Sequence, residues 1–89
     1  MNYRVDWLYS TIKELATLWT NADSATRNRI TKATHEIDSQ LTHDPLNVGE
    51  SRAHGRRMLI EAPLGVNYRV DNGDVTVLHV WRFRERIHP

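Results

Sequence analysis

Cysteine is absent from the 89 residues of this chain. Disulfides, thiolate metal sites and cysteine nucleophiles are therefore excluded, which fits a reducing compartment. Long apolar runs are also absent, and no stretch approaches the roughly 18 apolar residues that span a bilayer. The N-terminal residues 1–6 contain no apolar segment of the kind found in secretion signals. We therefore expect a cytoplasmic protein with no membrane partner.

Glycine and proline are scarce, with four and three residues respectively. No linker, internal repeat or low-complexity tract is present. The apolar fraction of 39% and the charged fraction of 26% are those of a folded globular protein. We expect one domain, residues 1–89. A chain this short buries only about 60–65% of its unfolded surface, so its core is small and a partner that covers an apolar face would matter.

The first half of the sequence predicts one short strand and two helices. Residues 2–7 alternate between apolar and charged side chains, which is typical of a strand. Thr11 and Glu14 have the spacing of a capping box. The apolar face of the first helix then consists of Ile12, Leu15, Ala16 and Trp19. Residues 21–24 supply N-caps for a second helix, which Pro45 ends. Its apolar face consists of Ile30, Ala33, Ile37 and Leu41.

The second half predicts a loop followed by strands. Residues 45–55 read as a loop, residues 58–60 as a buried strand, and residues 66–70 as the next strand. Asn72-Gly73 is a strong signal for a hairpin that leads into the last strand. Strict alternation puts Val75, Val77, His79, Trp81 and Phe83 on one face of that strand. The other face would carry Thr76, Leu78, Val80, Arg82 and Arg84.

These elements together predict an α+β domain of order β-α-α-β-β-β, in which a helical hairpin packs on a small, mainly antiparallel sheet. The last strand is apolar on both faces for most of its length, so we expect it to be central. We expect the three tryptophans, Trp7, Trp19 and Trp81, to lie in the core.

Basic residues are distributed unevenly. Residues 1–44 carry five basic and six acidic side chains, whereas residues 45–89 carry seven and five, and all seven are arginine. The planar arginine fork matches phosphate or carboxylate. One group of arginines ends the last strand and consists of Arg82, Arg84 and Arg86. The other lies in the loop at Arg52-Ala53-His54-Gly55-Arg56-Arg57.

Metal-free RNA cleavage needs a base, a cation for the phosphorane charge, and an acid. Arg82 and Arg84, about 7 Å apart on one strand face, could hold phosphates or could instead protect a strand end. Glu50 could act as a base or pair with Arg52. The loop residues Arg52, His54, Arg56 and Arg57 could line a phosphate groove or form a solvated loop. His79 could be a base or a core residue.

Cofactor motifs are missing. The histidine spacings fit no metal site, and the sequence has neither a phosphate loop nor a dinucleotide fingerprint. We therefore expect no metal and no small-molecule cofactor.

The length, element order and several segments resemble the RelE/ParE superfamily of bacterial toxins from type II toxin–antitoxin systems. The resemblance covers nearly the whole chain. It is carried by Tyr3-Arg4-Val5-Asp6-Trp7 with Leu15-Ala16, Ile37-Asp38, Asp44-Pro45, Leu64-Gly65-Val66-Asn67-Tyr68-Arg69-Val70, and the last strand from Val75 to Arg84.

This resemblance implies a toxin that either cleaves mRNA at the ribosome, as a metal-free endoribonuclease, or inhibits DNA gyrase. It also implies a cognate antitoxin as partner. The catalytic candidates are Arg82, Arg84, Arg69 and Glu50. Gly65 stands where many members have an arginine, and Arg69 is the nearest arginine. RNA-cleaving members tend to end in histidine or tyrosine after the last strand, where this sequence has His88 and no tyrosine.

Two other functions fit the same residues. The chain could be a non-catalytic protein-interaction module on the same scaffold, because a thin core favours a permanent partner. It could also be a small RNA-binding domain unrelated to toxins, in which case its affinity for RNA would depend on salt.

Overall fold

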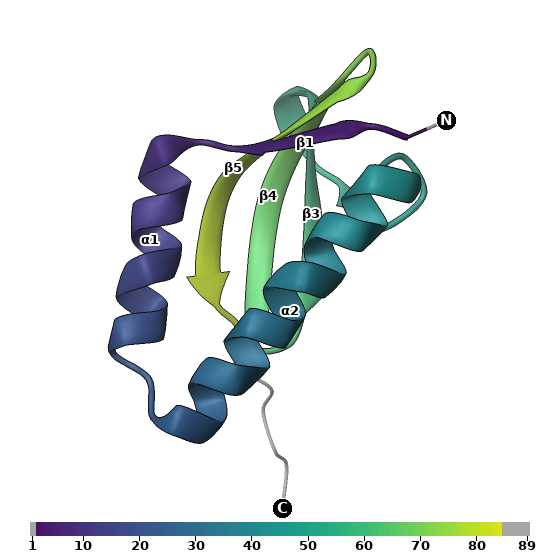
Figure 1. The fold of residues 1–89 in the computed structure, drawn as a ribbon. Helices are drawn as coiled ribbons and strands as arrows, with labels where there is room; N and C mark the ends of the chain where they lie inside the picture. The colour runs from purple at the N-terminus through teal and green to yellow at the C-terminus, as the bar shows by residue number, and fades with distance from the viewer. Residues whose placement is uncertain (1, 85–89) are drawn as a thin grey trace, which may run out of the picture.

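A computed structural model describes residues 2–84 of the chain. Figure 1 shows two helices beside a curved sheet. The elements in order are β1 (Arg4–Trp7), α1 (Tyr9–Thr20), α2 (Ser24–His43), β2 (Glu50–Ser51), a short 3₁₀ turn η1 (Ala53–Gly55), β3 (Arg56–Glu61), β4 (Leu64–Asp71) and β5 (Asp74–Arg82). None of the described helices has the length and apolar character needed to cross a membrane.

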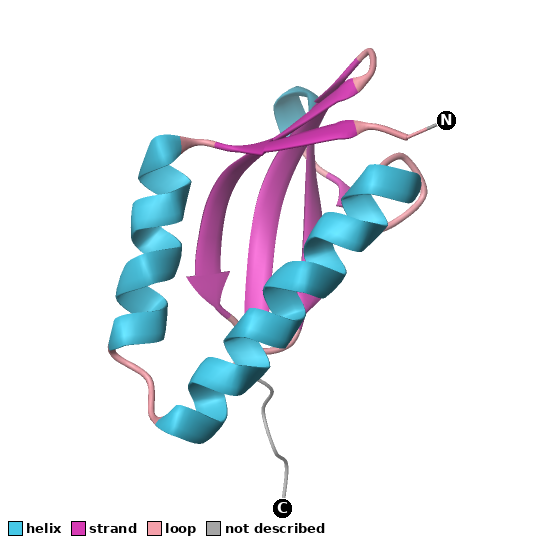
Figure 2. Cartoon of the chain, viewed as in Figure 1, coloured by secondary structure: helices cyan, strands magenta, loops and turns pink. Residues whose placement is uncertain are grey.

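The five strands form one sheet in the order β1-β5-β4-β3-β2. β1 runs parallel to β5, and the other neighbours are antiparallel. Helix α2 crosses one face of the sheet, and α1 lies alongside β5 (Figure 2). The predicted α+β class and the mainly antiparallel sheet are confirmed. The last strand, β5, is an interior strand with a neighbour on each side, and β4 is the middle strand. The short edge strand β2 lies where the sequence predicted a loop.

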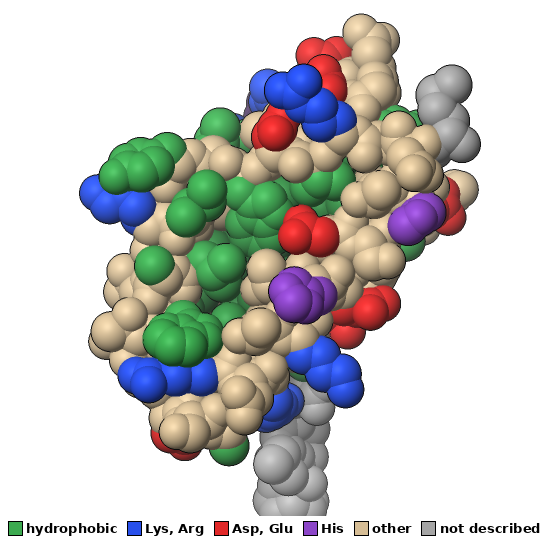
Figure 3. Space-filling model, in the orientation of Figure 1, with side chains coloured by type: hydrophobic (Ala, Val, Ile, Leu, Met, Phe, Trp, Pro, Cys, Tyr) green, Lys and Arg blue, Asp and Glu red, His purple; other side chains and the backbone are tan. Residues whose placement is uncertain are grey.

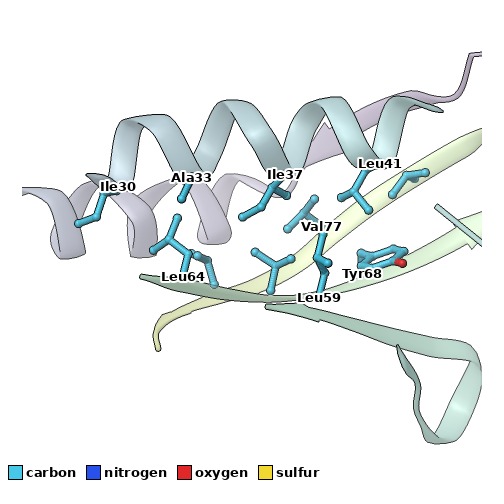
Figure 4. Close-up of a cluster of buried hydrophobic side chains, with 11 residues drawn as sticks. Ile30, Ala33, Ile37, Leu41, Leu59, Leu64, Tyr68 and Val77 are labelled. Atoms are coloured by element: carbon cyan, nitrogen blue, oxygen red, sulfur yellow. The ribbon is translucent and has the colours of Figure 1, made fainter. Parts of the chain in front are cut away.

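The core lies between α2 and the sheet. Figure 4 shows Ile30, Ala33, Ile37 and Leu41 projecting from one side of α2 toward the strands. All four are at most 4% exposed, which confirms the predicted apolar face. Each fully buried isoleucine or leucine contributes roughly 1.5–3 kcal/mol to folding. They meet Leu59, Leu64, Val66, Tyr68, Val75, Val77 and Val80 from the sheet.

Helix α2 begins with the predicted kind of N-cap. The Asp23 carboxylate accepts a hydrogen bond from the backbone N–H of Thr26 at 2.8 Å. This bond is the main reason that the pKa of the Asp23 carboxyl lies below its usual value, because it stabilises the charged form. The turn between the two helices is therefore fixed by a local interaction.

Helix α1 differs from its prediction in two ways. It begins at Tyr9, and no side chain caps it, so the capping box at Thr11 and Glu14 is wrong. Thr11 is instead fully buried, and its hydroxyl donates to the Leu78 carbonyl of β5 at 2.6 Å. The predicted apolar face is also largely uncovered, since Ile12 is 50% exposed and Trp19 is 44% exposed. Trp19 is therefore not a core residue.

A β-bulge interrupts the pairing of β4 with β5. Tyr68 lies opposite Val77, but Asn67 lies opposite His79, so Leu78 is an extra residue on β5. Because one extra residue reverses the alternation of every later side chain, Val80 and Arg82 turn toward α2. The faces predicted for β5 by strict alternation are right up to Val77 and wrong from His79 onward.

Gly65 is explained by the side chain opposite it. Trp81 pairs with Gly65 across the strands, and a Cβ at residue 65 would lie 2.5 Å from the indole ring. The indole therefore lies against the bare backbone of β4, on the face turned away from α2. Trp81 is only partly buried, which corrects its assignment to the core.

Replacing Gly65 by alanine tests this contact. The new methyl group would push the indole of Trp81 out of place, so we expect Gly65→Ala to lower the free energy of unfolding by about 1–3 kcal/mol. Urea unfolding of the purified chain measures the difference. Gly73→Ala is the matched control, because a Cβ there meets nothing within 4 Å. Equal stability of the two variants would contradict the proposed packing.

Candidate functional site

The sheet has one face that no described helix covers, and we call it the outer face. Strand register places its side chains, because residues paired across strands point the same way. Its residues are Arg4, Asp6, Glu50, Arg56, Met58, Ile60, Gly65, Asn67, Arg69, Asp71, Asp74, Thr76, His79 and Trp81. Three of the predicted site residues, Glu50, Arg56 and Arg69, are therefore on one surface.

Arg56 and Arg69 form a cross-strand pair in the outer face. They are direct partners on β3 and β4, and both side chains are exposed. Within residues 2–84, neither guanidinium has an ion-pair or hydrogen-bond partner. Like charges directly opposite each other destabilise a sheet. An anion held between the two forks would remove that repulsion, so this pair is a candidate phosphate site.

Two further rows of side chains follow this pair along the sheet. The next row runs across four strands and consists of Glu50, Met58, Asn67 and His79. The row beyond it consists of Ile60, Gly65 and Trp81. The outer face thus changes from cationic through polar to apolar and aromatic.

The loop cluster divides between two environments. Arg52 forms the ion pair with Glu50 that the sequence offered as one alternative, at 3.0 Å, and both side chains are partly exposed. His54 is exposed, with a backbone φ of 62° in the left-handed region. These residues flank β3 at the edge of the outer face. Arg56 faces outward with them.

Arg57 faces the opposite way and has a structural role. Its guanidinium donates to the Tyr68 hydroxyl at 3.2 Å and to the Val48 carbonyl at 3.1 Å. The Tyr68 hydroxyl in turn donates to the Pro45 carbonyl at 2.6 Å. Burial raises the pKa of Tyr68 because it disfavours the phenolate. The structure thus places Arg57 under the loop and not among the exposed loop cations, because β3 alternation turns its side chain inward.

Arg82 and Arg84 do not share a strand face. The bulge turns Arg82 toward the helices, opposite Leu64, where its Nε is buried without a hydrogen-bond partner in the described residues. Its charge also contributes to the lowered pKa of Asp23 at the helix turn. Strand β5 ends at Arg82, and Arg84 is exposed beyond it. The predicted shared strand face is therefore wrong. Arg86 and His88 lie outside the described residues.

His79 is brought to the outer face by the bulge. Its side chain is 57% exposed, and its Nδ1 lies 3.7 Å from Oε1 of Glu14 in α1. That carboxylate oxygen is buried and has no hydrogen-bond partner in the described residues. Sequence alternation had placed His79 with Val77, and no signal in the sequence marks Leu78 as an extra residue. Over residues 2–84, no three potential ligand side chains are grouped to hold a metal ion.

An apolar groove of about 380 Å³ lies between α1 and α2, on the side of the molecule shown in Figure 3. Its main lining residues are Ile12, Leu15, Ala16, Trp19, Ile30 and His35. Arg27 fixes Trp19 at one end of the groove. Its guanidinium carbon lies 4.6 Å from the centre of the Trp19 ring, and the guanidinium donates to the Trp19 and Thr20 carbonyls. The groove is the apolar face of α1 that the core leaves uncovered.

No protein-family model matches the sequence, and no curated protein matches it. Solved structures do. One is a chain of the chromosomal ParDE TA system from P. aeruginosa, with 16% identity, a TM-score of 0.71, and coverage of 92% of this chain and 97% of that chain. Another belongs to the RelBE2 toxin–antitoxin complex from Mycobacterium tuberculosis, with 23% identity, a TM-score of 0.72, and coverage of 94% and 100%.

The chain has the RelE/ParE fold. This confirms the fold that the sequence resemblance implied, including the helical hairpin and the mainly antiparallel sheet. Within this fold, the outer face and the groove lie on different sides of the chain. The outer face is built from the strands, and the groove is built from the two helices.

Replacing Tyr68 by phenylalanine tests the role of the buried hydroxyl. The change leaves the Pro45 carbonyl and the Arg57 guanidinium short of a partner, so we expect the free energy of unfolding to fall by about 1–3 kcal/mol. Urea unfolding with the matched variant Tyr9→Phe measures this. Tyr9 is 76% exposed, so its hydroxyl should contribute little. If the free energy of unfolding fell no further in Tyr68→Phe than in Tyr9→Phe, the structural role given to the Tyr68 hydroxyl would be contradicted.

Proposed function

We propose that this chain, residues 1–89, is the toxin of a type II toxin–antitoxin pair and that its outer face acts on mRNA at the ribosome. The cross-strand pair Arg56 and Arg69 carries the proposal, because two exposed forks that have no partner among the described residues suit a phosphodiester backbone. The proposal is also supported by the fold, which the chain shares with the ParDE and RelBE2 toxin–antitoxin structures.

The stability of the sheet favours a binding role for these arginines over a purely structural one. Arg56 lies directly opposite Arg69, and a like-charge pair does not stabilise a sheet. Asp6 and Asp71 lie on the same face, but within residues 2–84 neither forms an ion pair with these arginines. The net charge of +1 is too small for tight binding to nucleic acid through charge alone. The ribosome would therefore have to present the mRNA strand to the outer face.

The groove between the helices supports the second part of the proposal, a cognate antitoxin. A groove lined by Ile12, Trp19 and Ile30 suits the apolar side of an amphipathic helix. Lys13, over the Tyr9 ring, and Arg27, over the Trp19 ring, stand beside it. We therefore propose an antitoxin helix with acidic residues flanking its apolar stripe. A partner here would also relieve the exposure of apolar surface on a chain with a small core.

Replacing the arginine pair tests the proposed working surface. We expect Arg56→Ala with Arg69→Ala to abolish the growth arrest caused by the chain when it is expressed alone in bacteria. We also expect the double variant to cut ribosome-bound mRNA at least about tenfold more slowly, because the phosphate loses charge-assisted hydrogen bonds. Its stability should not fall, since a like-charge pair is removed.

Arg29→Ala provides the matched control, because Arg29 is an exposed arginine on α2. Full activity of the double variant would refute the arginine proposal. Growth arrest with intact mRNA and reduced DNA supercoiling by gyrase would instead assign the chain to gyrase inhibition. If the wild-type chain affected neither growth, translation nor gyrase, the non-catalytic interaction module would be the better description.

Replacing Trp19 tests the antitoxin groove. We expect Trp19→Ala to weaken neutralisation by the product of the adjacent antitoxin gene by about 10–100-fold in dissociation constant, because buried tryptophans carry much of the energy at such interfaces. Leu46→Ala is the matched control, since Leu46 is an exposed apolar residue outside the groove. Titration calorimetry on the purified pair measures both. Equal affinity for the two variants would place the antitoxin elsewhere.

A further inference from the structure

The outer face carries a histidine beside a carboxylate in the position expected of a base. From the placement of His79 and Glu14, we propose that His79 is the general base of RNA cleavage and that Glu14 positions it. This inference rests on the proposed action on RNA. It chooses the base over the core residue, the two alternatives that the sequence left open for His79, and it adds Glu14, which the sequence did not select for this role.

The geometry of the pair fits this role. Nδ1 of His79 faces Oε1 of Glu14 at 3.7 Å, which is longer than a hydrogen bond but close enough to become one after a small side-chain rotation. The Glu14 oxygen is buried and has no hydrogen-bond partner among residues 2–84, so it offers an acceptor near the ring. A proton fixed on Nδ1 leaves Nε2 as the acceptor, and more than half of the imidazole is exposed on the outer face.

His79 also lies at a suitable position relative to the arginines. It pairs with Asn67, and Arg69 is two residues further along β4 on the same face. Diagonal neighbours of this kind have Cβ atoms roughly 7–8 Å apart, within reach of long side chains. A phosphate held by Arg56 and Arg69 would place the adjoining ribose near His79.

Trp81 completes this arrangement on the other side of His79. It lies two residues beyond His79 on the same face, with its indole against Gly65. An aromatic ring at this place can stack on a base. The three rows of the outer face therefore match the three parts of a nucleotide: phosphate at the arginines, ribose at His79, and base at Trp81.

The proposed step is a transesterification with water as the final proton donor. Nε2 of neutral His79 takes the 2′-hydroxyl proton while the 2′-oxygen forms a bond to the adjacent phosphorus. The bond from phosphorus to the 5′-oxygen breaks, which gives a 2′,3′-cyclic phosphate and a 5′-oxygen that takes a proton from water. The resulting hydroxide removes the proton from the imidazolium. Arg56 and Arg69 would stabilise the charge that develops on the phosphorane.

Other charged groups near His79 are few. From the elements packed against β5, the groups on its outer side are Glu14 of α1, Arg69 and Asp71 of β4, and the Arg4–Asp6 ion pair of β1.

The test is single-turnover cleavage of mRNA on purified ribosomes, together with urea unfolding of each variant. We expect His79→Gln to slow cleavage by about 10²–10⁴-fold, the usual contribution of a general base. Its affinity for an mRNA with a 2′-deoxynucleotide at the cleavage position should remain within about twofold of the wild type. Glu14→Gln should slow cleavage less than His79→Gln does, with the free energy of unfolding and the affinity for the 2′-deoxy mRNA unchanged, because the imidazole loses the carboxylate that orients it. His43→Gln, at an exposed position on α2, is the matched control.

A purely structural contact between α1 and β5 gives different results. In that case Glu14→Gln would lower the free energy of unfolding and leave the cleavage rate of the folded protein at the wild-type value, and this outcome would overturn the role given to Glu14. Cleavage by His79→Gln at the wild-type rate would overturn the general-base assignment while leaving the proposed function intact. If the wild-type chain cleaved no mRNA on ribosomes, the proposed function itself would fail, and this inference with it.

Discussion

The extra residue in β5, Leu78, determines which face of the sheet each later side chain of that strand occupies. Its carbonyl accepts the hydroxyl of buried Thr11, and the Val77 carbonyl accepts the Leu8 backbone N–H, so the start of α1 is fastened at the bulge. After the bulge, each side chain of β5 lies on the opposite face of the sheet from the one that strict alternation predicts. His79 and Trp81 reach the outer face, and Arg82 turns toward the helix turn. Much of the candidate chemistry therefore depends on one irregular residue.

The bulge also relates the two surfaces to each other. Because Thr11 directs one side of α1 at β5, the opposite side of that helix, with Ile12 and Trp19, remains uncovered and forms the groove with α2. Glu14, one turn beyond Thr11, reaches His79 at the strand edge. The same helix thus contributes to both surfaces. A partner bound in the groove and a substrate on the outer face would contact different sides of α1. A partner in the groove would therefore not block the outer face sterically.

The sequence predicts the regular parts of the fold well. The face of α2 follows a strict helical period, and Asn72-Gly73 marks the hairpin, so both elements were identified correctly. The working surface was less predictable. A bulge leaves no mark in residues that are all compatible with a strand, so alternation put Arg82 and Arg84 together and placed His79 and Trp81 with the core. Arg57 looked like a loop cation because its partner, the Tyr68 hydroxyl, is eleven residues away and only strand pairing brings them together.

The central claim is that the outer face, as set by the bulge, is the surface that meets RNA. Nuclear magnetic resonance of the isotopically labelled chain, titrated with a short single-stranded RNA carrying 2′-deoxy sugars, tests it most directly. The account predicts shifts at Arg56, Arg69, His79 and the indole N–H of Trp81, which weaken as salt is raised because phosphate contacts release counterions. Shifts confined to Arg82 and the α1–α2 groove, with the outer face unchanged, would contradict it.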